Sequence, residues 1–332
     1  MTPFTILYCD AASADAWLND DRLLALLHFG SPTASPTDPR ICAVPLPELG
    51  GATAEVWLGA QPARTGVLDG VHYADNGAVL FLHLRLDESA PDALRSLTVA
   101  AYQRLFAAAR ALGYPHPLRI WNYFPAINQE VDGLERYRAF CVGRHAALGA
   151  EQVELETRLP AASAIGTCEP GLRLYALAAR EPGWQIENPR QVSAFHYPVR
   201  YGPQSPSFSR AILKHWGERD DHLYISGTAS VVGHASQHLD PMAQLDETLL
   251  NLEALIAQAN QRTSAPLHPA LLRVYVRPNL DPVLARARIA RAFGSDTPLL
   301  FLRADICRRE LLIEIEGLAT SVTTHHRRNH AP

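Results

Sequence analysis

The feature of this 332-residue sequence that most restricts its fold is an order of strand-like and helical stretches that occurs twice. Each half begins and ends with a stretch that has the pattern of an apolar strand, and two stretches with a helical pattern lie between these ends. The ranges expected in the first half are 78–86, 89–112, 118–124, 134–148 and 172–179. The ranges expected in the second half are 222–232, 241–256, 271–276, 282–293, 299–304 and 311–318. The repeat predicts an α+β protein of two related domains, each a mixed β-sheet with two helices packed on one face.

Local signals define the ends of the predicted helices. Leu94, Leu97, Ala101, Leu105 and Ala108 share one face of the first, and a Gly-Tyr-Pro sequence ends it. In the second half an Asp-Pro pair precedes a long apolar stripe, with the aspartate suited to the N-cap and the proline to the first helical position. These signals fix where both helices are expected to begin or end.

The length predicts two domains, which we expect at residues 1–150 and 151–332. Between residues 182 and 206 the chain carries five prolines, so this segment cannot be regular secondary structure throughout. A long irregular segment inside a compact chain is usually part of a functional site. We therefore expect a pocket mainly in the C-terminal domain, with the segment 182–206 as its roof.

Composition excludes several classes of protein. With 47% hydrophobic and 19% charged residues the chain can bury cores, and its net charge of -4 without a long basic stripe argues against a nucleic-acid partner. No apolar run reaches the ~18 residues of a membrane helix, and the start of the chain lacks the basic residues of a signal peptide. Five scattered cysteines without a CxxC pair indicate reduced thiols and a cytoplasmic location.

Common cofactor and catalytic motifs are missing from the sequence. It contains no GxGxxG after a strand, no GxxxxGK[ST], no HExxH and no GxSxG. His234 and His238 lie four residues apart, but a zinc site needs three or four convergent ligands, and no third one is near in sequence. We expect two polar loop histidines and no metal site.

Arginine occurs beside aromatic residues in several of the expected loops and helix starts. Any single arginine is usually exposed, but a group of them beside aromatic rings is typical of a site for a planar anion. The members of this group are Trp121, Tyr123, Arg136, Tyr137, Arg138, Arg144, His196, Tyr197, Arg200, Tyr201 and Arg210.

Two glutamates alternate with isoleucines near the end of the chain, in the sequence IEIEG at residues 313–317. In a strand, Glu314 and Glu316 point to one face and the isoleucines to the other. The pattern alone fits a half-exposed edge with two solvated carboxylates. It also fits a carboxylic acid held in the wall of a pocket.

Several segments between Arg119 and Gly317 resemble the chorismatase family, which includes the 3-hydroxybenzoate synthases. These segments are RIWNYFPAIN, LERYRAFCVGRH, FHYPVRYGPQSPSFSRA, LYISGTASVVGH and LRADICRRELLIEIEG. The C-terminal half is also similar to the small trimeric imine deaminases, whose last strand has a comparable EIE sequence. The resemblance implies two imine-deaminase-like domains, as a monomer or a homotrimer.

The resemblance further implies an enzyme that cleaves chorismate without a metal or an organic cofactor. A general acid protonates the enol-ether methylene, and pyruvate leaves. The acid of the family corresponds to Glu314, which burial would keep protonated, whereas Glu316 is the less suitable candidate. The residues expected to bind the substrate are Tyr123, Arg136, Tyr201, Arg210 and Arg303.

The subtype expected from the resemblance is the one that releases 3-hydroxybenzoate, with 4-hydroxybenzoate as a possible second product. Such members carry a cysteine seven residues before the acid, as Cys307 is here, and Gly227 in SGTAS leaves room in the pocket. Cys307 would also fit as a small buried hydrophobic residue. Three alternatives stay open: release of a dihydroxycyclohexadiene carboxylate, an imine or enamine deaminase, and a non-catalytic ligand-binding relative.

Overall fold

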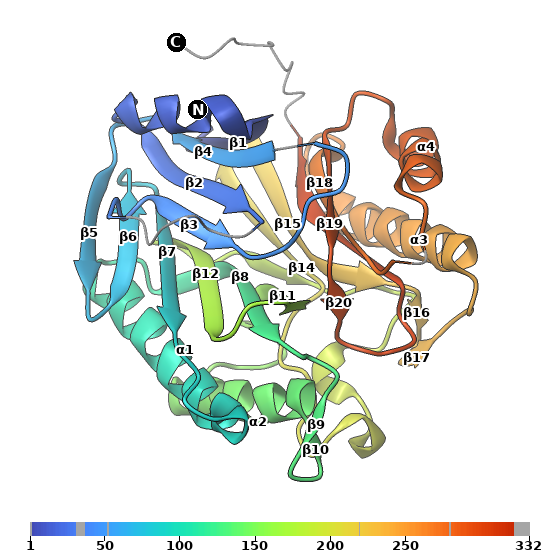
Figure 1. The fold of residues 1–332 in the computed structure, drawn as a ribbon. Coiled ribbons are helices and arrows are strands. Elements are labelled where there is room, and N and C mark those ends of the chain that lie inside the picture. Colours follow the sequence, from blue (N-terminus) through green and yellow to red (C-terminus); the bar gives the residue numbers. More distant parts are fainter. Residues whose placement is uncertain (1, 31–36, 52, 219, 279, 322–332) are drawn as a thin grey trace.

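Three β-sheets surround a common centre in the computed structural model, with the helices on the outside (Figure 1). The structure describes residues 2–30, 37–51, 53–218, 220–278 and 280–321. None of the helices in this part of the chain combines the length and the apolar composition that crossing a bilayer requires.

The C-terminal sheet has the strand order β13-β14-β15-β21-β18-β19. Its strands are β13 (Trp184–Ile186), β14 (Ala211–Gly217), β15 (Asp220–Ala229), β18 (His268–Val276), β19 (Leu299–Arg303) and β21 (Ile313–Thr320). Two helices, α3 (Pro241–Asn260) and α4 (Pro282–Phe293), cover its outer face, where they share one apolar cluster with the sheet. The strand with the two glutamates, β21, is therefore central and not an edge.

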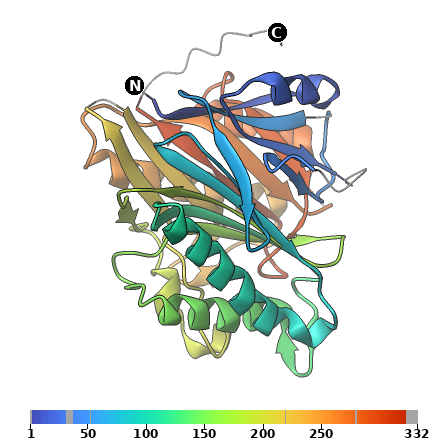
Figure 2. The same ribbon diagram turned by 90° about the vertical axis from the view of Figure 1, so that its left-hand side faces the viewer.

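The second sheet has the order β20-β11-β8-β12-β7-β6-β5. Its strands are β5 (Arg64–Leu68), β6 (Val71–Asp75), β7 (Val79–Leu86), β8 (His116–Pro125), β11 (Ala161–Thr167), β12 (Leu172–Ala179) and β20 (Asp305–Ile306). The helices α1 (Leu94–Ala111) and α2 (Arg136–Ala150) pack on its outer face (Figure 2).

The repeat predicted from the sequence is confirmed strand by strand. When the second sheet is read from β11 to β5 and the C-terminal sheet from β19 to β13, their strands follow one another in the same order. The first pair in each sheet, β11–β8 and β19–β18, is parallel. The domain boundary expected at residue 150 does not coincide with the point at which the chain passes from one sheet to the next. Because β11 and β12 complete the first of these sheets, the chain changes sheets after β12, near residue 180.

The first sixty residues form a third sheet that the sequence analysis did not predict. It consists of β1 (Phe4–Asp10), β4 (Thr53–Gly59), β2 (Leu23–Phe29) and β3 (Ile41–Val44), in this spatial order. The pair β2–β3 is parallel and the other pairs are antiparallel. The second sheet has the same pattern, with β8–β11 parallel and β12–β8 and β12–β7 antiparallel. The sheet repeats the inner strands of the other two, with only the short helical segment η1 (Ala11–Asn19) as a cover.

Short elements complete the chain: η2 (Pro91–Ala93), η3 (Ala194–His196), η4 (Val199–Tyr201) and the two-stranded pairs β9 (Glu130–Val131) with β10 (Leu134–Glu135) and β16 (Val231–Val232) with β17 (Ala235–Ser236). The helix starts follow the expected chemistry. The Asp240 carboxylate accepts a hydrogen bond of 2.8 Å from the Ala243 backbone, directly before Pro241.

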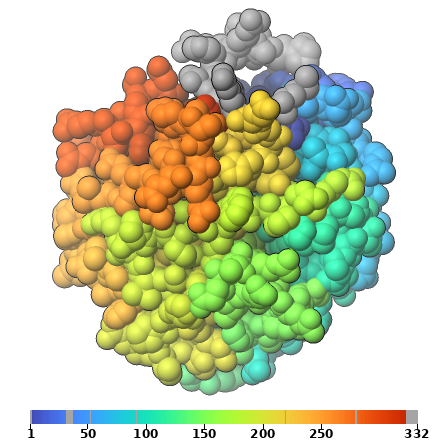
Figure 3. Space-filling model, turned by 180° about the vertical axis from the view of Figure 1, so that it is seen from behind, coloured from blue at the N-terminus to red at the C-terminus, as the bar shows by residue number. Residues whose placement is uncertain are grey.

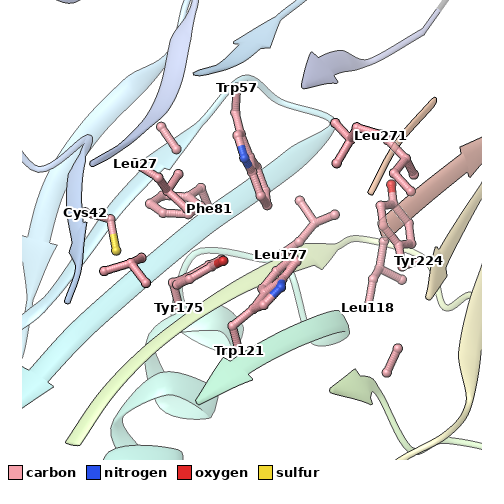
Figure 4. Packing of buried hydrophobic residues seen from close by; sticks show 14 of the residues in the cluster. Leu27, Cys42, Trp57, Phe81, Leu118, Trp121, Tyr175, Leu177, Tyr224 and Leu271 are labelled. Atoms are coloured by element: carbon pink, nitrogen blue, oxygen red, sulfur yellow. The ribbon is translucent and has the colours of Figure 1, made fainter. Parts of the chain in front are cut away.

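The inner faces of all three sheets share one apolar cluster (Figure 4). Trp57 from β4, Trp121 from β8 and Tyr175 from β12 meet at its centre, and the rings of Trp121 and Tyr175 stack at 4.5 Å. Because each sheet buries its inner face against the other two, none of the three faces is left in water.

Candidate active site

A cavity of about 320 Å³ opens at the carboxyl end of β15 and the start of β21. The turn after Cys307 and the start of α2 form its sides. The predicted roof is present, since Gln191, Tyr197, Tyr201 and Pro206 from the proline-rich segment line the cavity. In Figure 3 this yellow-green segment lies on the surface between the green of α2 and the orange of the C-terminal helices.

Glu314 lines this cavity from the second position of β21 and is 4% exposed. Among the described residues, none donates a hydrogen bond to its carboxyl group. Burial raises the pKa of Glu314 to about 8, the Glu316 carboxylate adds to this rise, and Arg119 and Arg210 oppose it. At neutral pH Glu314 is therefore mainly a neutral acid that faces the cavity.

Gly227 is the residue that brings the backbone of β15 close to Glu314. A Cβ atom at this position would overlap with Oε1 of Glu314 and would lie 3.1 Å from Oγ of Ser163. The Gly227 N–H donates a hydrogen bond of 3.0 Å to the same Ser163 oxygen. A side chain at position 227 would therefore displace the Glu314 carboxyl group. The small residue predicted at this position thus lies in direct contact with Glu314.

Arg210 lines the cavity in contact with the proline-rich segment and is 5% exposed. Its Nη2 donates hydrogen bonds of 2.8 Å to the Val192 carbonyl and to the Tyr197 hydroxyl. Its buried Nε has no hydrogen-bond partner among the described residues. A fixed guanidinium with an unused donor can bind a carboxylate.

A second group of cations lines the outer part of the cavity. The Arg308 guanidinium lies over the rings of Tyr201 and Tyr197, at 4.3 and 5.2 Å from their centroids. Arg200 lies 5.1 Å from the Tyr201 ring and donates to Nδ1 of His234 at 2.9 Å. Stacking on the tyrosine rings holds these guanidinium groups in place beside the cavity.

Glu316, two positions after the acid, lies in a buried polar network at the junction of the three sheets. It is 2% exposed and pairs with Arg119 from β8 at 2.6 Å and with Arg273 from β18 at 3.0 Å. Arg273 also pairs with Glu55 from β4 at 2.6 Å. Two arginines hold the Glu316 carboxylate, and Glu316 does not line the cavity, which favours Glu314 as the acid.

Five of the eight predicted site residues come together in the cavity: Tyr201, Arg210, Gly227, Cys307 and Glu314. The other three do not line it. Arg136 forms a bidentate pair with Glu88, with both distances 2.8 Å, and Arg303 is exposed at the end of β19. Tyr123 lines a different cavity, and its hydroxyl lies 3.1 Å from that of Tyr275. These three predictions are revised, because internal partners or distance separate the side chains from the cavity.

Sequence reasoning missed three residues that shape the site. Arg308 follows Cys307 directly, which was a usable signal, but the sequence does not show which of the two consecutive arginines, Arg308 or Arg309, lies against the aromatic rings. Ser163 donates a hydrogen bond to Glu316 and accepts one from Gly227, and Arg119 pairs with Glu316. Neither Ser163 nor Arg119 has a local pattern that indicates these contacts.

The geometry defines an enzyme site for a small anionic molecule: a neutral buried acid, fixed arginines and aromatic walls in one cavity. The described residues contain no group of three His, Cys, Asp or Glu side chains placed to hold a metal ion.

Comparisons with known proteins identify the family. The model of the family "Chorismatase FkbO/Hyg5-like, N-terminal" matches residues 55–178. A 3-hydroxybenzoate synthase from Streptomyces hygroscopicus is 38% identical over 80% of this chain and 81% of its own length. A chorismatase from Streptomyces rapamycinicus is also 38% identical, over 80% of this chain and 81% of its own. A crystal structure of a chorismatase covers 96% of this chain and 98% of its own, with 34% identity and a TM-score of 0.82.

The chain therefore belongs to the chorismatase family. The expected α+β fold and the expected class of enzyme, one that acts on a small molecule, are both confirmed.

Proposed function

We propose that this protein cleaves chorismate to pyruvate and a hydroxybenzoate, mainly 3-hydroxybenzoate, with Glu314 as the general acid. The observation that carries the proposal is a buried, neutral carboxyl group that faces a cavity lined by arginines. Its family relatives include a 3-hydroxybenzoate synthase. Chorismate is a dianion with an enolpyruvyl ether, and the cavity offers both the proton and the cations that this substrate needs.

In the proposed reaction the Glu314 carboxyl transfers its proton to the methylene carbon of the enol ether. The carbon that carries the ether oxygen becomes an oxocarbenium-like centre, which the neighbouring ring hydroxyl or a water captures. When a water captures it, the bond from this carbon to the ether oxygen breaks, the ring oxygen takes a proton, and pyruvate leaves with the oxygen of the water. When the ring hydroxyl captures it, the bond between that oxygen and the ring breaks and the ring carbon that bears the ether oxygen loses its proton, which makes the ring aromatic. The bond to the ether oxygen then breaks, the ether oxygen takes a proton and stays on the ring as the phenol, and pyruvate leaves with the oxygen of the former hydroxyl. Release of a hydroxybenzoate consumes no net water, whereas release of the dihydroxycyclohexadiene carboxylate consumes one. Arg210, Arg200 and Arg308 would hold the two carboxylates during these steps.

The proposed function is tested by incubating the purified protein with chorismate. We expect pyruvate in an enzymatic assay, and 3-hydroxybenzoate by mass spectrometry in an equal molar amount if 4-hydroxybenzoate is a minor product. Pyruvate together with the dihydroxycyclohexadiene carboxylate alone would assign the other subtype. A folded protein that releases no pyruvate would contradict the proposal.

The Arg210→Gln variant should raise the KM for chorismate about ten- to a hundred-fold. The change removes a charged hydrogen bond, which typically contributes about 1.5–3 kcal/mol. Steady-state pyruvate release gives the KM, and Arg291→Gln on the exposed face of α4 is the matched control. An unchanged KM would remove Arg210 from the binding site.

The Cys307→Ala variant should still release pyruvate but shift the products toward the dihydroxycyclohexadiene carboxylate. Cys307 lines the same cavity as Glu314, and burial raises the pKa of its thiol far above neutral, so it is a poor nucleophile. The reason for the shift is that a smaller side chain leaves room for water near the ring. Complete loss of pyruvate release in a folded variant would contradict a role in steering.

A further inference from the structure

A second cavity, of about 470 Å³, lies between the first sixty residues and the sheet that follows them. It is larger than the candidate active site, and its lining comes mostly from β3, β6, β7, β8 and β12. None of the residues that line it belongs to the candidate active site. The cavity therefore needs an explanation of its own.

The register of the strands gives this cavity the same place in its sheet as the active site has in the C-terminal sheet. Glu314 is the second residue of the eight-residue strand β21 and lies opposite Tyr275. Arg173 is the second residue of the eight-residue strand β12 and lies opposite Tyr123. Each lines the cavity next to it. An arginine thus occupies the position of the acid.

Arg173 has an unused donor in this cavity. It is 9% exposed, and its Nη2 pairs with Oε2 of Glu169 at 2.8 Å. Its buried Nε has no hydrogen-bond partner among the described residues. Arg85 lies directly opposite on β7, where it pairs with the exposed Asp87. A buried N–H without a partner is unfavourable, and a carboxylate is the ligand that a guanidinium edge binds best.

Apart from Arg173 and the Arg85–Asp87 pair, the walls of the cavity are formed by the apolar residues of β3 and by neutral aromatic rings. The rings of His72 and His83 stack at 4.8 Å, and those of Tyr123 and Tyr175 stack at 5.8 Å. Burial lowers the pKa of His83 to about 4 and also lowers the pKa of His72, so both rings are neutral at pH 7. Stacked neutral rings beside one buried guanidinium suit a planar ring that carries a single carboxylate.

We propose that this second cavity binds a small aromatic monocarboxylate of the hydroxybenzoate class and does not convert it. A substrate with two carboxylates is a poorer ligand, because the other guanidinium that lines the cavity, that of Arg85, is half exposed and already paired with Asp87. The ligand is not converted, because an arginine and not an acid stands at position 173. The identification of the ligand with the enzyme's own product rests on the proposed function. The inference that the cavity binds an aromatic monocarboxylate rests only on the residues that line it.

The first test is calorimetry with 3-hydroxybenzoate as the probe. We expect two binding events in the wild type. Arg173→Gln should weaken one of them at least ten-fold and leave the release of pyruvate from chorismate unchanged. Arg210→Gln should weaken the other event, and Arg291→Gln, on an exposed helix face, should weaken neither. A single event that only Arg210→Gln weakens would overturn the proposal.

A second measurement does not depend on the folding of a variant. Wild-type crystals soaked with 3-bromobenzoate should show an anomalous bromine peak in the cavity beside Arg173. A peak in the active-site cavity alone would overturn the proposal. A peak beside Arg173 in a protein that releases no pyruvate would retain the second site and contradict the proposed function, so the two failures are distinguishable.

Discussion

The Glu314→Gln variant is expected to bind chorismate and to release pyruvate about 10²–10⁴-fold more slowly than the wild type. Glutamine keeps the shape of the side chain and a hydrogen-bond donor, but it cannot give a proton to the enol-ether methylene. Since the ether is unreactive until this carbon is protonated, the loss should appear in kcat and much less in the binding of chorismate. The measurements are pyruvate release and calorimetric binding, on a variant shown to be folded by circular dichroism.

The pH profile of the wild type provides a separate check on this acid. Because the pKa of Glu314 is raised to about 8, the carboxyl is protonated at neutral pH and loses its proton as the pH rises through 8. Glu316 stabilises the protonated form, and Arg119 and Arg210 stabilise the ionised one. We expect kcat to be level below this pH and to fall above it. A kcat that rises through pH 8 would contradict the assignment, as would near-normal turnover in Glu314→Gln.

The Glu316→Gln variant is expected to lose about 3–5 kcal/mol of folding free energy, the usual cost of leaving buried charges without a partner. In pyruvate release we expect this change to be much milder than Glu314→Gln, because Glu316 is one step further along the same face. The structure adds an expected loss of stability. Glu316 pairs with Arg119 and Arg273, and it accepts further hydrogen bonds from Trp121 at 2.8 Å and Tyr275 at 2.7 Å.

This prediction is measured by urea unfolding, with Glu253→Gln on the exposed side of α3 as the matched control. A domain is typically stable by about 5–15 kcal/mol, so the expected loss is a large share of the total. An unfolding free energy equal to that of the control would show that the network contributes little. A folded, stable and inactive Glu316→Gln would instead move the acid to Glu316.

Much of the fold and part of the site followed from local sequence. The alternation of Glu314 and Glu316 with isoleucines correctly predicted that both glutamates share one face of a strand. The prolines between residues 182 and 206 correctly predicted a segment over the cavity. The sheet of the first sixty residues was missed, because its strands lack the flanking helices that marked the other two.

Periodicity, capping residues and turn residues reveal the local backbone and the face that is buried, so the sequence by itself determined the repeated order of elements and the strand that carries the acid. It could not separate Arg210 from Arg136, since both lie near aromatic residues. Only the tertiary structure paired Arg136 with Glu88, 48 residues away in sequence, and left an unused donor on Arg210. The charge partner of a buried group is set by residues that folding brings together from distant parts of the chain, and local patterns do not encode it.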